Sequence, residues 1–199
     1  MKHLKMLGLA AIAAAALTAF LGAGTASAET TELFGGATTL SSGSTISSSL
    51  ESGSSAQLSD TSGELADTCK GSTVEGKTTN TTGSNVGGSI NTLDWANCTW
   101  TTNTLANGSL SITKKASSND GTVTGSGSQV TVQVFGFLDC TYGTGAGTHL
   151  GTLDGVTSGN ATLAINAVIN LESGAFCPET TKWVANYVVT SPTSLNVGS

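Results

Sequence analysis

The chain has 199 residues, of which 38% are hydrophobic and only 10% are charged, and its 7 basic and 13 acidic side chains give a net charge of −6. Nucleic-acid-binding proteins neutralise phosphates with clusters of lysine and arginine, and this acidic chain lacks such basic clusters. The same charge disfavours attraction to anionic lipid headgroups, so neither nucleic acid nor an anionic membrane surface is expected as a partner.

The first 28 residues have the three parts of a secretory signal peptide. A basic start at residues 2–5 precedes an apolar run over 6–21, and small residues follow up to Ala28. The apolar run is shorter than the ~20 residues that span a bilayer. We therefore expect a signal-peptide helix within 1–28, cleavage between Ala28 and Glu29, and secretion, with no integral membrane segment after cleavage.

Removal of this segment leaves a mature chain with five lysines, no arginine and thirteen carboxylates, for a net charge of −8. This chain is rich in Ser, Thr, Gly and Ala, a composition that also occurs in disordered proteins. Its β-branched and aromatic residues are arranged in periodic segments, however, and such segments indicate a folded chain. We expect a loose N-terminal segment over 29–36. A single folded domain over 37–199 is long enough to bury a core.

Alternation of apolar and polar residues with a period of two predicts strands along most of the mature chain. Turn signals rich in Asn, Asp, Ser and Gly separate the candidates. In chain order, the predicted strands are Thr45–Leu50, Ala56–Leu58, Cys69–Val74, Ser89–Trp95, Ser109–Thr113, Gly121–Thr124, Val130–Val134, Leu163–Leu171 and Trp183–Val189.

The pattern of these strands indicates the fold class. No segment after residue 28 has the 3.6-residue stripe of an amphipathic helix, and frequent Thr, Val, Ser and Gly disfavour helices. About ten strands without intervening helices predict an all-β protein. We expect an antiparallel β-sandwich, immunoglobulin-like or jelly-roll-like, whose core lies between two sheets.

All four cysteines, Cys69, Cys98, Cys140 and Cys177, lie in the mature chain. In an oxidising compartment an even set predicts two disulfides, although four cysteines permit three connectivities. A zinc site would need closely spaced cysteine pairs or several histidines, and His149 is the one histidine of the mature chain. We favour the pairs Cys69–Cys98 and Cys140–Cys177, because each brackets a few successive strands, and we expect no metal or other cofactor.

A resemblance to other proteins rests on short strings spread over nearly the whole mature chain: Asp67–Val74, Leu93–Thr99, Cys140–Gly145, Leu150–Leu153, Phe176–Pro178 and Tyr187–Val197. Together they resemble a group of small secreted proteins from actinobacteria. That group has no assigned activity, so the resemblance implies a secreted, disulfide-bonded β protein and implies no function.

The mature chain lacks a recognisable catalytic constellation. Nucleophilic hydrolysis needs a base beside the nucleophile, but there is no G-x-S-x-G motif. His149 follows a glycine-rich run, which is typical of a solvated loop and lacks the G-x-G-x-x-G spacing of a dinucleotide site. Acid–base candidates for glycoside hydrolysis remain by elimination alone: Asp94, Asp139, Glu172 and Glu179. We expect no catalytic residue and no enzyme activity.

Two other groups of residues offer binding chemistry. Asp60, Glu64 and Asp67 form an acidic cluster that could hold calcium weakly, but a polar turn is the preferred interpretation. Trp95 and Trp183 lie on apolar stripes, and large aromatic side chains in such positions usually fill a core. Trp100 and Tyr142 are therefore the candidate ligand contacts.

The sequence favours a noncatalytic secreted or cell-surface-associated β-domain with a structural or adhesive role and a cell-wall or other extracellular component as partner. The alternative is an extracellular module that binds a small ligand or a glycan. A deep apolar cleft or an exposed aromatic platform would discriminate between these hypotheses.

Overall fold

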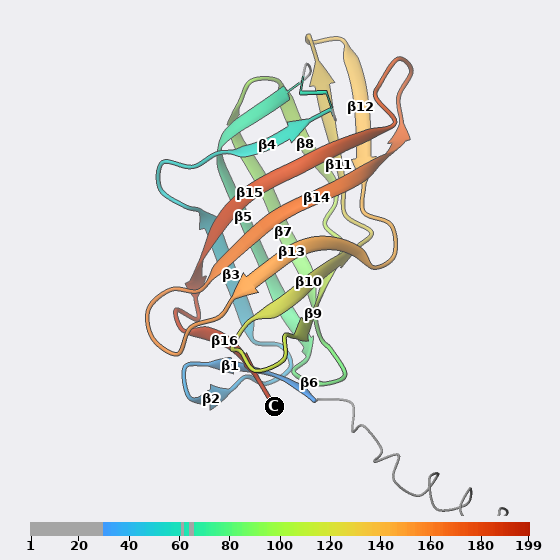
Figure 1. Cartoon of the computed structure of the whole chain (residues 1–199). Coiled ribbons are helices and arrows are strands. Elements are labelled where there is room, and N and C mark those ends of the chain that lie inside the picture. The colour runs from blue at the N-terminus through green and yellow to red at the C-terminus, as the bar shows by residue number, and fades with distance from the viewer. Residues whose placement is uncertain (1–29, 61, 64–65) are drawn as a thin grey trace, which may run out of the picture.

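The computed structural model describes residues 30–60, 62–63 and 66–199. Every regular element within this part of the chain is a strand, and the strands form a larger 12-stranded sheet and a smaller 4-stranded sheet (Figure 1). The all-β class predicted from the alternation of apolar and polar residues is confirmed. The signal peptide and its cleavage site lie outside the described residues.

Eight strands of the larger sheet, counted within the described residues, close into a barrel. Strand β15 pairs with both β14 and β3, and β3 pairs with β5, which completes the ring. The ring replaces the two-sheet sandwich expected from the sequence, because both architectures bury one face of each strand and share the same alternation. Its strands are β3 (Thr45–Leu50), β5 (Ala66–Asn80), β7 (Val86–Cys98), β9 (Ser109–Lys114), β10 (Gly121–Ser126), β13 (Thr148–Asp154), β14 (Thr162–Ser173) and β15 (Thr180–Ser191).

Toward the end drawn uppermost in Figure 1, which we call the upper end, strands of the barrel pair with additional strands outside the ring of eight. There β12 pairs with β14, β11 lies between β12 and β8, and β4 lies between β5 and β15. Strand β8 returns beside β7, where the indole N–H of Trp95 donates to Thr104 Oγ1 at 3.1 Å. These additional strands are β4 (Ala56–Ser59), β8 (Thr101–Ala106), β11 (Gln129–Val134) and β12 (Leu138–Gly143).

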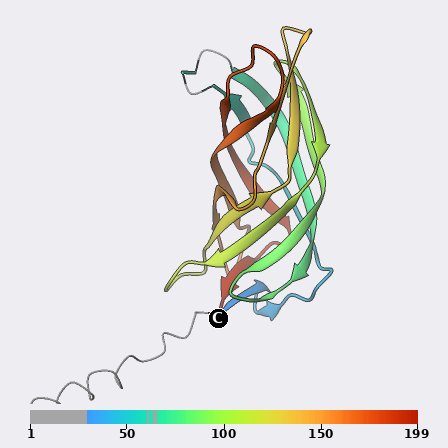
Figure 2. The ribbon, with the colours of Figure 1, turned by 90° about the vertical axis from the view of Figure 1, so that its right-hand side faces the viewer.

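The smaller sheet covers the opposite, lower end of the barrel (Figure 2). Thr31 and Leu33 of β1 are 0% and 2% exposed, and β1 pairs with β16 from the other end of the chain. The expectation of a loose segment over 29–36 is therefore wrong for residues 31–35. A strand this short shows little periodicity, and its partner is more than 150 residues away. The strands are β1 (Thr31–Gly35), β2 (Thr38–Thr39), β6 (Thr82–Gly83) and β16 (Leu195–Gly198).

Most predicted strands lie where the alternation placed them, but the sequence missed several others. Strand β3 has the predicted bounds, whereas β5 and β7 extend well beyond theirs. Strands β8, β12 and β13 were not predicted, since threonine, glycine and acidic residues interrupt their apolar stripes. The glycine-rich run before His149 spans the end of β12 and the connection to β13. These two strands do not pair with each other, because β14 lies between them in the sheet.

Both disulfides have the predicted connectivity. Cys69–Cys98 joins β5 to the end of β7, and Cys140–Cys177 joins β12 to the loop between β14 and β15. Both bridges lie toward the upper end of the barrel. Two disulfides are consistent with an oxidising or extracellular environment.

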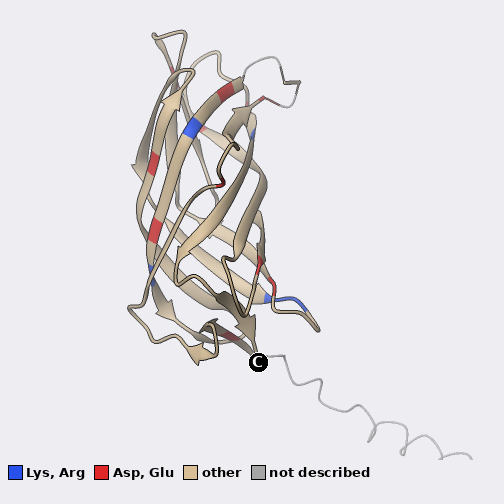
Figure 3. Ribbon diagram, turned by 90° about the vertical axis from the view of Figure 1, so that its left-hand side faces the viewer, with Lys and Arg blue, Asp and Glu red and all other residues tan. Residues whose placement is uncertain are grey.

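Charged residues are sparse along the strands and loops (Figure 3). Among the described residues, no helix has the length and apolar character needed to cross a membrane.

Candidate functional site

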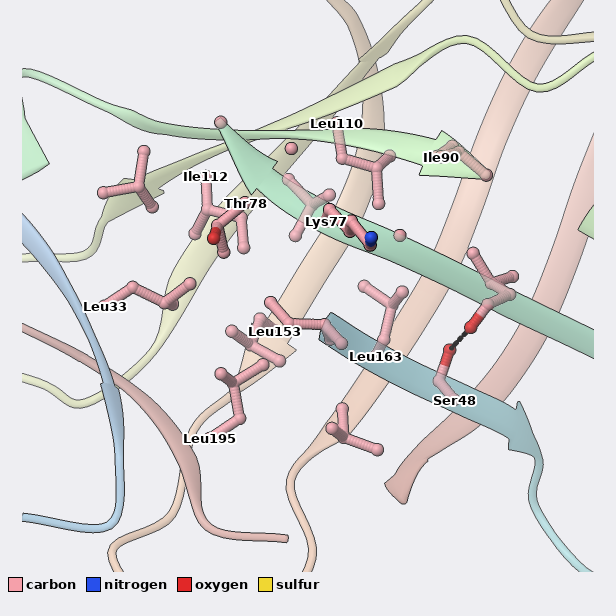
Figure 4. A pocket seen from close by; sticks show the side chains of 18 of the residues that line it. Leu33, Ser48, Lys77, Thr78, Ile90, Leu110, Ile112, Leu153, Leu163 and Leu195 are labelled. Carbon is pink, nitrogen blue, oxygen red and sulfur yellow. Dashed lines mark hydrogen bonds between the residues drawn. The ribbon is translucent and has the colours of Figure 1, made fainter. Parts of the chain in front are cut away.

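The lower half of the barrel interior contains a cavity, which we call the lower cavity. The space between its lining side chains, together with the open solvent at its mouth, amounts to about 700 Å³, and the centre of a water molecule can move within about 80 Å³ of it. Every strand of the eight-stranded ring contributes a lining side chain, and Leu33 and Leu195 from the smaller sheet close the floor (Figure 4). Its apolar lining consists of Leu33, Ile46, Val74, Val86, Ile90, Leu110, Ile112, Val123, Leu153, Leu163, Val189 and Leu195.

Water reaches this cavity, although its wall is apolar. Ile46, Ile90 and Leu110 are only half-buried despite facing the interior. Two lining hydroxyls already have acceptors within the protein: Ser48 donates to the Val74 carbonyl oxygen at 3.4 Å, and Thr78 donates to the Ser41 carbonyl oxygen at 2.8 Å. The interior surface therefore offers mainly hydrocarbon to a ligand.

Strands β5 and β7 approach each other closely where they form the wall of the lower cavity. A Cβ atom on Gly76 would lie 2.5 Å from the Ser89 carbonyl oxygen, and one on Gly88 would lie 3.1 Å from the Lys77 carbonyl oxygen. The strand register shifts between Glu75 and Gly76. Glycine in a strand commonly marks such a bulge or close approach, and here it bends the wall around the cavity.

A layer of large aromatic side chains lies above the lower cavity. Tyr187 lies one inward position above Val189 on β15, and its hydroxyl is 3.0 Å from Ser72 Oγ. Trp183 follows on the same face and packs against Trp95, with ring centroids 5.8 Å apart. Trp183 belongs to the buried apolar cluster, as expected, and the half-buried Trp95 packs against that cluster.

A second cavity, the upper cavity, lies at the other end of the barrel. Its space, with the open solvent at its mouth, amounts to about 590 Å³, and the centre of a water molecule can move within about 150 Å³ of it. It is lined by aromatic rings, aliphatic side chains and two carboxylates. Its lining residues are Leu58, Asp60, Asp67, Trp100, Val132, Val134, Phe135, Leu138, Cys140, Tyr142, Phe176, Pro178 and Thr181.

Four aromatic side chains, Trp100, Phe135, Phe137 and Phe176, form what we call the aromatic rim of the upper end. Phe135, Phe137 and Phe176 are 64%, 79% and 97% exposed. The ring of Phe135 meets Trp100 edge-on at 5.7 Å and stacks with Phe137 at 6.4 Å. Exposed apolar groups gathered in this way are typical of a contact surface.

The backbone at two rim positions is in the left-handed region that bulky residues avoid. Phe135 has a φ of 53° and Phe176 a φ of 63°. Such conformations are unfavourable for phenylalanine and are concentrated at functional sites. The fold therefore holds these two exposed rings at an energetic cost.

Asp67 is the most buried carboxylate of the upper cavity. It is 1% exposed, and it accepts hydrogen bonds from the Trp100 backbone N–H at 3.0 Å and from the Thr102 hydroxyl. Asp60 accepts a hydrogen bond from the Ser62 hydroxyl. Burial raises the pKa of Tyr142 above 10, and the nearby Asp60 carboxylate raises it further.

The structure brings both sequence-predicted ligand contacts, Trp100 and Tyr142, to the same upper cavity. The polar-turn interpretation is wrong for Asp67, which is buried within β5, and Glu64 lies outside the described residues. Asp67 is grouped with Cys69 and Cys98 within 4.8 Å, but both sulfur atoms are in a disulfide and cannot act as thiolate ligands.

The other candidates for chemistry lie on the outer surface. The glycine-rich run had suggested that His149 lies in a loop, but His149 is an exposed residue of strand β13. The four acid–base candidates are likewise exposed, and Asp139 accepts a hydrogen bond from Gln133 Nε2 at 3.1 Å. The expectation that the chain has no catalytic residue stays a prediction.

Sequence reasoning singled out Asp67 only as part of an acidic turn, and it missed Phe135 and Phe176 as contributors to the upper cavity. Asp67 precedes Cys69 by two residues and so shares its inward face, a signal that period two could have revealed. Phe135-Gly136-Phe137 connects β11 to β12, and it has two aromatic residues where a turn usually has polar ones. Phe176 lies next to a disulfide cysteine, and nothing in the sequence pattern marks it.

Comparison with known proteins found no matching family model, no similar curated protein and no similar solved structure.

Proposed function

We propose that the chain is a secreted, noncatalytic protein that binds a small apolar ligand in the lower cavity. The lower cavity itself carries the proposal: eight strands surround a solvent-accessible space with an almost entirely hydrocarbon wall. Ligand sites in proteins are typically concave and lined mainly by hydrophobic residues. The proposal therefore favours the small-ligand hypothesis over a purely structural role.

The chemistry of the wall selects the class of ligand. Since Ser48 and Thr78 donate to protein carbonyl oxygens, a ligand with many hydroxyl groups would lose hydrogen bonds to water without regaining them. Lys77 is exposed and contributes to the edge of the cavity (Figure 4). An acyl chain or another compact hydrocarbon suits this site, and a polar sugar does not.

Secretion is part of the proposal. It is supported by the basic, apolar and small-residue pattern of residues 1–28 and by two disulfides, which form in oxidising compartments. The described fold begins with β1 at Thr31, so cleavage after Ala28 would leave every described strand intact. An actinobacterial origin likewise stays a prediction that rests on the resemblance.

The test is a fluorescence titration of the purified mature protein with N-phenyl-1-naphthylamine, a neutral apolar probe. A Leu163→Trp variant fills the lower cavity from β14, and we expect it to weaken probe binding by about tenfold or more. Val168→Trp is the matched control, since Val168 is 53% exposed on the outer face of the same strand.

Two results would refute apolar-ligand binding in the lower cavity. One is the absence of saturable binding to the folded mature protein. The other is equal affinity in the wild type and in a folded Leu163→Trp variant, which would place the probe elsewhere. Thermal unfolding of both variants verifies that they are folded.

One observation favours the structural or adhesive role as a second candidate. Phe135, Phe137 and Phe176 expose three apolar rings at one end of the barrel, where they could contact an extracellular component. This role needs no ligand in the lower cavity and is compatible with one.

A further inference from the structure

We propose that the upper cavity binds a small organic cation, an ammonium group that carries methyl or similar apolar substituents. The site is distinct from the lower cavity, so this inference goes beyond the proposed function and does not depend on it. The binding groups are the rings of Trp100, Phe135 and Phe176 and the carboxylates of Asp60 and Asp67.

The aromatic lining provides the apolar and electrostatic part of the site. The faces of aromatic rings attract cations within about 6 Å of the ring centroid, with tryptophan the most effective. Trp100 and Phe135 meet edge-on at 5.7 Å and both line the cavity. Phe176 is 97% exposed, so its ring is available at the mouth.

The charge of the lining selects a cation. No lysine, arginine or histidine is among the described lining residues, whereas two carboxylates are. Asp67 is 1% exposed, and the two groups that donate to it, the Trp100 N–H and the Thr102 hydroxyl, are both uncharged. A buried carboxylate without a cationic donor favours a positive ligand and repels an anionic one.

Tyr142, which also lines the cavity, gives a second sign of negative potential. Burial raises the pKa of this phenol, and the charge of the Asp60 carboxylate raises it further. A neutral glycan would stack on the rings but would gain nothing from either carboxylate. The combination of rings and carboxylates therefore favours a cation over a sugar.

The upper cavity is also held in place before any ligand binds. Cys140–Cys177 fixes the loop that carries Phe176 to β12, and Cys69–Cys98 ends two residues before Trp100. The left-handed backbone of Phe135 and Phe176 is maintained within this cross-linked end. A site fixed in this way loses little conformational entropy on binding.

The first experiment compares two probes of the same shape by isothermal titration calorimetry on the disulfide-bonded mature protein. Choline carries a quaternary ammonium group, and 3,3-dimethylbutan-1-ol replaces its nitrogen with carbon. We expect choline to bind at least about tenfold more tightly than the alcohol. Equal binding of both probes, or no binding of choline at millimolar concentration, would overturn the proposal.

The second experiment locates the choline site with matched variants. Asp60→Asn removes a cavity charge at nearly constant shape, and Asp139→Asn removes an exposed charge from the same end of the barrel outside the lining. Trp100→Leu removes a lining ring, and Phe137→Leu removes a rim ring that does not line the cavity. Choline binding weakens severalfold in Asp60→Asn and Trp100→Leu but changes little in the two controls.

Equal effects of a lining variant and its control would contradict this assignment, and circular dichroism verifies that each variant is folded.

A trimethylammonium group occurs both in free solutes and in phosphatidylcholine headgroups. Sedimentation with phosphatidylcholine vesicles distinguishes the sources. Co-sedimentation that choline abolishes identifies the lipid headgroup, and no co-sedimentation identifies the free cation.

Discussion

At the scale of single residues, Tyr187 shows how a polar group is accommodated in the interior. It is the largest fully buried side chain of the described residues, and its hydroxyl shares a 3.0 Å hydrogen bond with Ser72 Oγ. Burial disfavours the phenolate and raises the pKa of Tyr187 to about 12, although the bond to Ser72 acts in the opposite direction. The folded state therefore holds this proton more tightly than the unfolded chain does.

This shift predicts an alkaline loss of stability. The contribution of Tyr187 is complete below pH 10, where the phenol is protonated in both states. It is lost as pH rises from 10 to 12, where the unfolded state releases the proton first. The free energy of unfolding should fall over this range by about 2 kcal/mol more in the wild type than in Tyr187→Phe.

Urea denaturation at pH 7, 10 and 12 measures this difference. At pH 7 the variant should lose about 1 kcal/mol, because buried Ser72 no longer has its tyrosine partner. An identical alkaline decline in both proteins would show that another group is responsible.

At the scale of elements, long strands connect the two halves of the barrel. Strand β7 pairs with β9 at the lower end and leads into β8 at the upper end, while β14 pairs with β13 below and β12 above. This change of partners gives the two ends different walls, one mainly aliphatic and one aromatic and acidic. The disulfides support the second wall.

Removal of either disulfide should therefore destabilise the fold. The bridges link cysteines separated by 29 and 37 residues, so each restricts a similar length of the unfolded chain. We expect the double variants Cys69→Ser/Cys98→Ser and Cys140→Ser/Cys177→Ser each to lose about 3–4 kcal/mol of unfolding free energy, measured by urea denaturation. An unchanged urea midpoint in either double variant would show that its bridge does not stabilise the fold.

At the scale of the whole molecule, the barrel is closed at its lower end by β1 and β16, which come from opposite ends of the described chain. Because β1 begins at Thr31, a chain that starts at Glu29 retains this cap. We expect the protein recovered from the medium of a secreting bacterial host to have the intact mass of residues 29–199, less the four hydrogen atoms lost in forming two disulfides. An extracellular protein that retains residues 1–28 would contradict cleavage.

Local sequence patterns determined the all-β class and most of the strands, and they favoured the disulfide pairing. Alternation such as that from Leu163 to Leu171 records which side of a strand is buried, because side chains point to opposite faces in turn. The order of the cysteines and strands favoured, among three possible connectivities, the one that the structure shows. Composition identified Trp100 and Tyr142 as candidate ligand contacts, without indicating that they line one cavity.

Only the tertiary structure decided how the strands pair and what lies between them. The pairing of β15 with β3 closes a barrel in place of a sandwich, and the pairing of β1 with β16 orders a segment expected to be loose. Both contacts join residues more than 130 positions apart, and period two carries no information about such partners. The cavities follow from closure: Asp67 and Phe176 reach one site because the ring brings β5 and the β14–β15 loop together, a distance in space that no local pattern encodes.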